Sequence, residues 1–229
     1  PGVFPYVRGT KKANNTWYVR QEIKVETPQM ANGKAVELLE KGVNSFSFVI
    51  GEAVFDKDYI ITLLNEIPAD KVELNFTVDQ MAVVEFAKLL VQYFENKNYN
   101  LVDLKGTINF DYFNHMLLTG KEEGPMVQLS KKLVDTIQPL PFYRVLNVNA
   151  RTLTNAGSYI TQELGYALAW GNEYLRTLVE SNLSPAVIAK KIKFNFGVGS
   201  NYFLEIAKFR AARIVKTNGL MVSVVVLQK

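Results

Sequence analysis

Residues 151–171 read RTLTNAGSYITQELGYALAWG, and residues 196–213 read FGVGSNYFLEIAKFRAAR. The first stretch predicts a helix over about 158–180. The second starts with a glycine-rich turn at 197–200, which follows a predicted strand at 192–196 and opens another helix. Helix, strand and helix therefore succeed one another in this part of the chain, as they do in α/β folds.

The same alternation extends through the rest of the chain. Short apolar runs bounded by turn residues predict further strands at 45–50, 72–77, 104–110, 143–148 and 221–227. Helical patterns lie between them, and the clearest covers about 78–96, with Thr77 and Gln80 as a capping box. The alternation predicts parallel strands joined by crossover helices. Six such strands fit either an open doubly wound sheet or most of an eightfold barrel, and the pattern alone leaves both open.

The composition of the chain is that of an ordinary globular protein. Its 229 residues are 48% hydrophobic, 12% aromatic and 21% charged, which supplies enough apolar surface for a substantial core. The absence of cysteine excludes disulfides and thiolate catalysis. The first residues do not read as a signal peptide, and no apolar run reaches the length of a membrane helix. We therefore expect a cytoplasmic protein without membrane contact.

The charge of the chain does not favour nucleic-acid binding. The formal net charge is +4, but the lysine doublets at 11–12, 131–132 and 190–191 are separate and form no basic stripe. Nucleic-acid-binding surfaces need clustered Lys and Arg with stacking aromatic rings. We expect no nucleic-acid partner and interpret the scattered charge as solvated surface.

The first 30 residues differ from the rest of the chain. Their prolines, polar stretch and aromatic residues predict an N-terminal arm over 1–30, ahead of an α/β domain over 31–229. The arm could bury its rings against a partner or pack on its own domain, and both remain open. The candidate interface residues are Phe4, Tyr6, Arg8, Trp17 and Arg20.

Few local patterns favour binding or catalysis. The turn at 197–200 could hold a phosphate, but it lacks the third glycine of a dinucleotide motif and the lysine of a P-loop, so a tight structural turn is the stronger interpretation. His115 is the only histidine, and Asp111 could orient its ring. Without a second histidine or a cysteine, we expect no zinc site.

Other polar residues fall where a barrel would place its mouth. Asp111 and Glu52 follow predicted strands, and asparagines 147, 149, 155 and 195 lie near strand ends. They could act on a ligand or simply satisfy loop backbone groups. On the last helix, Arg210 and Arg213 with Lys208 nearby could touch a nucleotide. The alternative, which we favour, is a solvent-facing or salt-bridged side of an amphipathic helix with an apolar stripe of Ile206, Phe209 and Ile214.

The two stretches quoted first resemble the acyl-CoA mutase barrel of the methylmalonyl-CoA mutase family. Runs at 4–10 (FPYVRGT), 17–21 (WYVRQ), 32–45 and 140–145 (LPFYRV) are similar to other parts of that barrel. The resemblance implies a TIM-type (β/α)8 barrel with an N-terminal arm. Residues 214–229 do not follow the family pattern, so we expect the barrel to be incomplete in this chain.

Several departures from the family pattern concern the residues of catalysis. Catalytic members read Gly-Tyr-His-Met-Gln-Glu-Ala-Gly where residues 150–157 read ARTLTNAG, so Thr152 stands at the position of the catalytic histidine. Residues 12–16 lack the CoA-binding Thr-Met-Tyr-x-x-x-Arg element, and Glu22 replaces a tyrosine. No Asp-x-His-x-x-Gly cobalamin motif is present in the sequence. The resemblance therefore implies no catalytic, cofactor-binding or metal-binding residues in this chain.

Such a pattern is similar to that of a non-catalytic small subunit of a heterodimeric mutase. This enzyme is an isomerase that interconverts succinyl-CoA and methylmalonyl-CoA in propionate metabolism. The resemblance implies a large catalytic subunit as partner, with adenosylcobalamin bound by that subunit. A stand-alone acyl-CoA-binding or regulatory barrel module remains an alternative, as does an active mutase that uses different residues.

Overall fold

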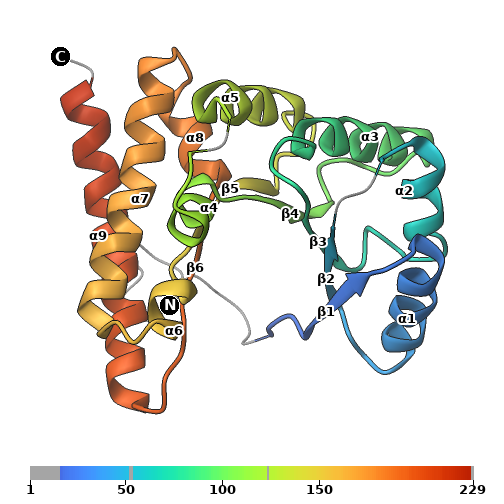
Figure 1. Cartoon of the computed structure of the whole chain (residues 1–229), viewed down its shortest axis with the longest axis horizontal. Helices are drawn as coiled ribbons and strands as arrows, with labels where there is room; N and C mark the ends of the chain where they lie inside the picture. The colour runs from blue at the N-terminus through green and yellow to red at the C-terminus, as the bar shows by residue number, and fades with distance from the viewer. Residues whose placement is uncertain (1–15, 52–53, 123, 228–229) are drawn as a thin grey trace. The chain divides into compact units, whose positions relative to one another are not determined.

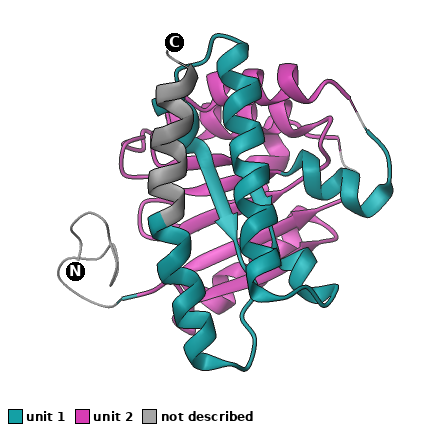
Figure 2. Cartoon of the chain, turned by 90° about the vertical axis from the view of Figure 1, so that its left-hand side faces the viewer, with its two compact units in different colours: residues 1–16, 111–123, 147–229 teal, residues 17–110, 124–146 magenta. Residues whose placement is uncertain are grey.

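A computed structural model describes residues 16–51, 54–122 and 124–227 (Figure 1). The chain divides into two compact units (Figure 2). Unit 1 comprises Pro1–Thr16, Asp111–Glu123 and Asn147–Lys229, and unit 2 comprises Trp17–Phe110 and Gly124–Leu146. Both units are therefore discontinuous in sequence.

The strands lie in one sheet, in the order in which they follow along the chain. They are β1 (Arg20–Val25), β2 (Ser45–Ile50), β3 (Glu73–Thr77), β4 (Lys105–Phe110), β5 (Tyr143–Asn149) and β6 (Ile192–Asn195). Each neighbouring pair from β1 to β5 is parallel. A doubly wound sheet reverses its strand order at a switch point, whereas a barrel keeps the sequential order. The described strands therefore agree with part of a barrel, and closure into a full TIM-type barrel stays a prediction.

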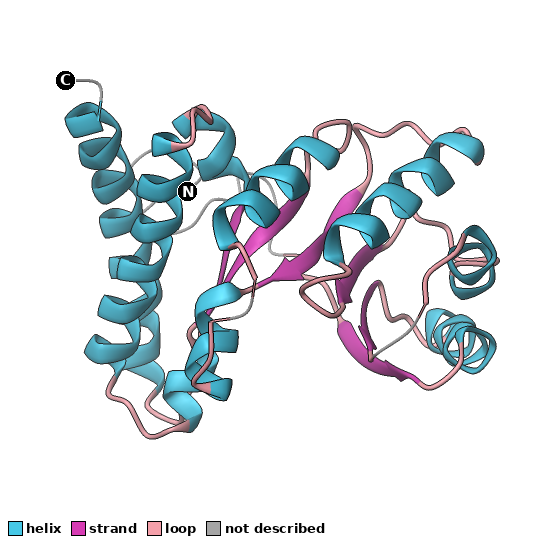
Figure 3. Ribbon diagram, turned by 45° about the horizontal axis from the view of Figure 1, so that its top comes forward, coloured by secondary structure: helices cyan, strands magenta, loops and turns pink. Residues whose placement is uncertain are grey.

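Helices alternate with these strands, as the sequence predicts (Figure 3). Unit 2 contains α1 (Pro28–Glu40), α2 (Lys57–Leu63), α3 (Val83–Asn96) and α5 (Met126–Thr136). Unit 1 contains α4 (Tyr112–Thr119), α6 (Arg151–Asn155), α7 (Ile160–Glu180), α8 (Pro185–Lys191) and α9 (Tyr202–Leu227). In unit 2, α1 lies against α2, α2 against α3, and α3 against α5.

Aromatic side chains form much of the core of unit 2. Phe46 and Phe48 alternate along β2 and are fully buried, and Phe48 stacks on Phe76 of β3 with 5.7 Å between ring centroids. Phe86 of α3 packs on Phe76 at 5.0 Å. Alternation along the strands therefore directs one set of side chains toward the helix layer.

In unit 1, α7 and α9 lie side by side (Figures 1 and 2). Gly171 lets α7 approach β6 closely, because a Cβ at this position would lie only 2.5 Å from the ring of Phe194. Two buried residues of α7, Tyr174 and Leu178, complete the packed face of this helix. The close approach explains a glycine inside a helix, where it is otherwise unfavourable.

Two sequence predictions differ from the structure, and two observed elements had no prediction. Residues 221–227 belong to α9 and form no strand, because the helix that begins at Tyr202 continues through them. Helix α3 begins at Val83 and not near 78, since Asp79 accepts a hydrogen bond from the N–H of Met81 (2.8 Å) and holds a turn there. Strand β1 and helix α4 were not predicted. The division at residue 30 stays a prediction.

Within the described residues, no helix combines the length and the apolar character needed to cross a membrane.

Candidate functional site

Polar side chains gather at the carboxyl ends of strands in unit 1, the edge where parallel α/β folds bind ligands. Asn147 and Asn149 end β5, Asn195 ends β6, and Asp111 follows β4. The Asn195 amide donates to the side-chain oxygen of Asn147 (2.8 Å), and the Asn149 amide lies 3.5 Å from the Thr152 hydroxyl. These amides therefore bond to one another and to the following helix, which supports a structural use for them.

Thr152 lies on the short helix α6 and is partly exposed. Its hydroxyl group carries no charge and keeps its proton at neutral pH, so it cannot exchange protons as an imidazole does. Two residues later, Thr154 packs against Gly197, where a Cβ would lie 2.6 Å from the Thr154 hydroxyl oxygen. The α6 segment therefore provides close packing and no group suited to acid–base chemistry.

A buried cluster of three charged side chains connects residues 151–171 with residues 196–213. The ammonium group of Lys208 on α9 lies 2.7 Å from carboxylate oxygens of Glu163 on α7 and Glu205 on α9. It also donates to the carbonyl oxygen of Gly197 at 2.7 Å. The three side chains are 0%, 1% and 8% exposed for Lys208, Glu163 and Glu205. Lys208 therefore forms hydrogen bonds to Glu163 and Gly197 and an ion pair with Glu205.

The charges in this cluster stabilise one another. Burial lowers the pKa of Lys208, but the hydrogen bonds and negative charges of Glu163 and Glu205 raise it by more. The pKa of Lys208 is therefore raised above its ordinary value. The hydrogen bond from Lys208 is the main reason why the pKa of Glu205 is lowered. A buried lysine remains charged here because both neighbours are carboxylates.

The same carboxylates accept hydrogen bonds from backbone N–H groups of the glycine-rich turn. The N–H of Gly197 donates to Glu163 (2.6 Å), and the N–H of Gly199 donates to Glu205 (2.9 Å). A phosphate would have to displace both carboxylates to reach these groups. The geometry therefore favours the tight structural turn over a phosphate site.

The surroundings of α9 agree with one of the two alternatives that the sequence left open. Lys208 was expected near a solvent-facing or salt-bridged side, and it is buried and salt-bridged, whereas Ile206 of the expected apolar stripe is 38% exposed. Partner carboxylates keep Lys208 inside, and its side of the helix turns inward with it. Tyr202 and Phe203 on the same helix are 69% and 80% exposed.

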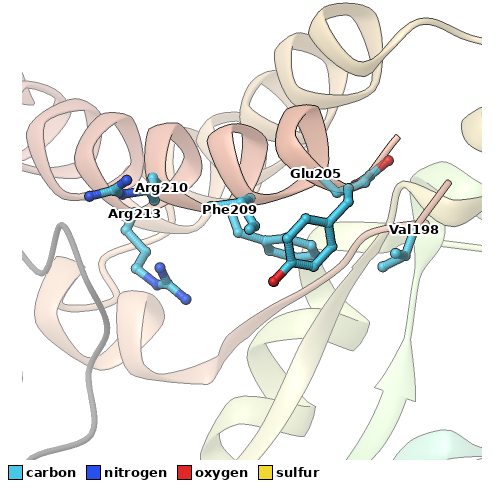
Figure 4. A pocket seen from close by; sticks show the side chains of 7 residues that line it. Val198, Glu205, Phe209, Arg210 and Arg213 are labelled. Atoms are coloured by element: carbon cyan, nitrogen blue, oxygen red, sulfur yellow. The ribbon is translucent and has the colours of Figure 1, made fainter. Parts of the chain in front are cut away.

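An open hollow of about 570 Å³ runs along the first half of α9 (Figure 4). Arg210 and Arg213 lie at one end of it and Val198 at the other, with the ring of Phe209 between them. Arginines beside aromatic rings match the nucleotide-binding possibility raised by the sequence. The hollow is shallow and lies on the helix surface, which distinguishes it from an enclosed ligand pocket.

His115 lies on α4, and its Nε2 atom is buried among protein atoms. Among residues 16–51, 54–122 and 124–227, no group of three His, Cys, Asp or Glu side chains is arranged to hold a metal ion.

The candidate interface residues fall partly within the described chain. Phe4, Tyr6 and Arg8 lie outside the described residues, as does Glu52. Trp17 is 75% exposed, and its place at an interface stays a prediction. Arg20 is tied to its own unit, because its guanidinium donates to the hydroxyl of Ser45 and pairs with Glu73.

Arg20 is the first member of a polar row across unit 2 that sequence analysis did not foresee. Ser45 and Asn75 donate and accept within the row, and Asn75 accepts from the hydroxyl of Thr107 at 2.8 Å. Ser45, Glu73 and Lys105 are register partners on successive strands, and Asn75 pairs with Thr107. One face of β1–β4 is therefore polar and linked from strand to strand by side chains.

Comparison with known proteins agrees with the resemblance seen in the sequence. The family model described as methylmalonyl-CoA mutase matches residues 49–221. A methylmalonyl-CoA mutase small subunit of Porphyromonas gingivalis is 42% identical over 214 residues, which cover 93% of this chain and 34% of the relative. A small subunit of Streptomyces virginiae is 30% identical over 216 residues, covering 93% of this chain and 35% of the relative.

The large subunit is a separate relative. The methylmalonyl-CoA mutase large subunit of Streptomyces virginiae is 28% identical over 244 residues, which cover 94% of this chain and 33% of that protein. The chain thus spans about a third of the length of the curated relatives it matches. With the family match covering well over half of its residues, this chain belongs to the methylmalonyl-CoA mutase family.

Proposed function

We propose that this chain is a non-catalytic small subunit of a two-subunit methylmalonyl-CoA mutase, an isomerase of succinyl-CoA and methylmalonyl-CoA. The observation that carries the proposal is Thr152, an uncharged hydroxyl at the position where the family resemblance expects the catalytic histidine. The buried Nε2 of His115, the only histidine, supports it further. Relatives named as small subunits at 42% and 30% identity point to the same role.

In this role the chain stabilises the large catalytic subunit, which alone holds adenosylcobalamin and performs the rearrangement in the cytoplasm. The exposed Trp17 supports an interface near the start of unit 2, to which Phe4, Tyr6 and Arg8 would contribute. Arg20 would support that surface indirectly, because its pairing with Glu73 fixes the first residue of β1. Burying a large aromatic side chain is a common source of interface energy.

The proposal is tested by assaying succinyl-CoA isomerisation with added adenosylcobalamin. The chain alone is expected to show no turnover, and the large subunit of the same genome is expected to show turnover that this chain increases or stabilises. The variant Thr152→His serves as a control and is expected to remain inactive alone, because residues 12–16 and Glu22 also depart from the catalytic pattern of the family. Turnover by the unmodified chain in the absence of the large subunit would overturn the proposal.

A second function, an acyl-CoA-binding module without catalysis, is favoured by the polar face of β1–β4. Barrel interiors are usually filled by bulky Val, Ile and Leu, whereas Ser45, Asn75 and Thr107 occupy this face. Asn109, two residues after Thr107 on β4, has a buried side-chain oxygen without a hydrogen-bond partner in the described structure. Calorimetric titration of the isolated chain with CoA distinguishes the two functions, since only the second requires binding without a partner.

A further inference from the structure

The carboxyl group of Asp111 joins two segments of unit 1. Asp111 lies between β4 and α4 and is the N-cap residue of α4. One of its oxygens accepts a hydrogen bond from the N–H of Asn114 in the first turn of α4 (3.1 Å), and the other accepts from the N–H of Asn149 at the end of β5 (2.7 Å). A single side chain thus connects the start of a helix to the end of a strand that lies 38 residues away in sequence.

The start of α4 has a second attachment that does not depend on Asp111. The N–H of Tyr112 donates to the phenol oxygen of Tyr174 on α7 at 2.9 Å. Phe113 packs edge to face on the same ring, with 4.8 Å between centroids. The helix therefore stays on α7 even when its bond to Asp111 changes.

We propose that Asp111 is a proton-linked latch, which fastens α4 to the end of β5 when its carboxyl group is ionised and releases one of the two bonds when it is protonated. The latch adds to the proposed subunit role and does not depend on it. An ionised carboxylate accepts on both oxygens, and the positive end of the α4 dipole favours its charge. A proton taken from water turns one oxygen into a hydroxyl, which is a donor and a poor partner for a backbone N–H.

The surroundings of Asp111 set the pH at which this exchange occurs. Displacement of water from the carboxyl group raises the pKa of Asp111 to about 7, although both backbone N–H groups act to lower it. Tyr174 on α7 is close enough to feel the charge of Asp111, and Tyr112 is the next residue on α4. Burial raises the pKa of both phenols, so each is neutral when Asp111 titrates. Asn149 on β5 is uncharged, and His115 follows one turn later on α4.

An NMR titration of the full chain tests the latch. The amide resonances of Asn114 and Asn149 are followed from about pH 4, near the ordinary pKa of aspartate, to about pH 9. Both are expected to move together with one shared midpoint near 7, not near 4. The titration is expected to disappear in Asp111→Asn and to persist in His115→Gln, which removes the only histidine.

Three results would overturn the latch: a shared midpoint near 4, no movement of either amide, or a titration that vanishes in His115→Gln. Because the first two are read on the unmodified chain, the test stands even if Asp111→Asn fails to fold. Tyr174→Phe provides a further control. It removes the other attachment of α4 and is expected to leave the shared midpoint in place, since Asp111 keeps both of its partners.

Discussion

Replacing Lys208 with methionine removes the ammonium group that lies between two buried carboxylates. Methionine is similar in length and apolar, so the change deletes a charge with little loss of volume. In the native chain this group lies 2.7 Å from Glu163, Glu205 and the carbonyl oxygen of Gly197. The variant leaves two carboxylates facing each other at positions that are 1% and 8% exposed.

The expected loss of stability is large. Removing one partner of a buried ion pair costs roughly 3–5 kcal/mol, because the remaining charge is neither solvated nor paired. The free energy of unfolding of a domain is only about 5–15 kcal/mol, so the variant would lose a substantial part of its stability. In urea, with a slope of about 1–3 kcal/mol per molar, the unfolding midpoint is expected to fall by about 1 M or more.

Urea unfolding followed by circular dichroism measures this loss, and Arg176→Met is the matched control. Arg176 forms ion pairs with Glu173 and Glu180 on the exposed face of α7, where water and salt screen the charges. Its replacement is expected to shift the midpoint far less. Adding Glu163→Gln to Lys208→Met should recover part of the loss, because one unpaired charge disappears. Equal shifts for Lys208→Met and Arg176→Met would refute the reasoning.

Three further substitutions test the stability of unit 2 and of α7. Gly106→Ala on β4 would place a Cβ 1.9 Å from the Leu74 carbonyl oxygen, and it is expected to lower the free energy of unfolding by roughly 1–3 kcal/mol or more. Gly165→Ala has open space around the new Cβ and is expected to stabilise α7 by roughly 0.5–1 kcal/mol. Thermal unfolding of the two variants compares these effects. Burial raises the pKa of Glu73, but Arg20 and neighbouring hydrogen bonds lower it overall, so its stabilisation is present above the ordinary pKa of 4.5 and is lost as pH falls below it. Loss of this ion pair in Arg20→Met is therefore expected to lower the free energy of unfolding by at most about 1 kcal/mol at neutral pH, and to have no effect at a pH low enough to protonate Glu73. Urea unfolding midpoints of the variant and the unmodified chain, measured at neutral and at low pH, check this.

The strands that sequence analysis located are those with buried apolar runs. Residues 45–50 were predicted and observed with the same bounds, because SFSFVI is apolar and bounded by turn residues. Strand β1 was missed because RQEIKV buries only Ile23 and exposes most of its charged side chains. An edge strand of this kind looks like a polar arm until its pairing with β2 is known.

The buried charge cluster could not be predicted from local patterns. A lysine in an amphipathic helix is normally solvent-exposed, so the pattern of α9 left a solvent-facing or a salt-bridged side open and did not indicate that Lys208 is buried. Its partner Glu163 is 45 residues away, and only the packing of α7 on α9 brings them together. The family itself was recognised from these same two stretches, since Glu163 lies in the first of them and Glu205 and Lys208 in the second.

The role of the chain as a subunit is tested most directly by the mass of its complex. The chain is co-expressed at its full natural length with the large mutase subunit of its own genome, and the purified material is weighed by native mass spectrometry. The proposed role predicts a complex of one small and one large chain, with cobalamin bound only to the large one. A chain that purifies alone, or only with copies of itself, would contradict it.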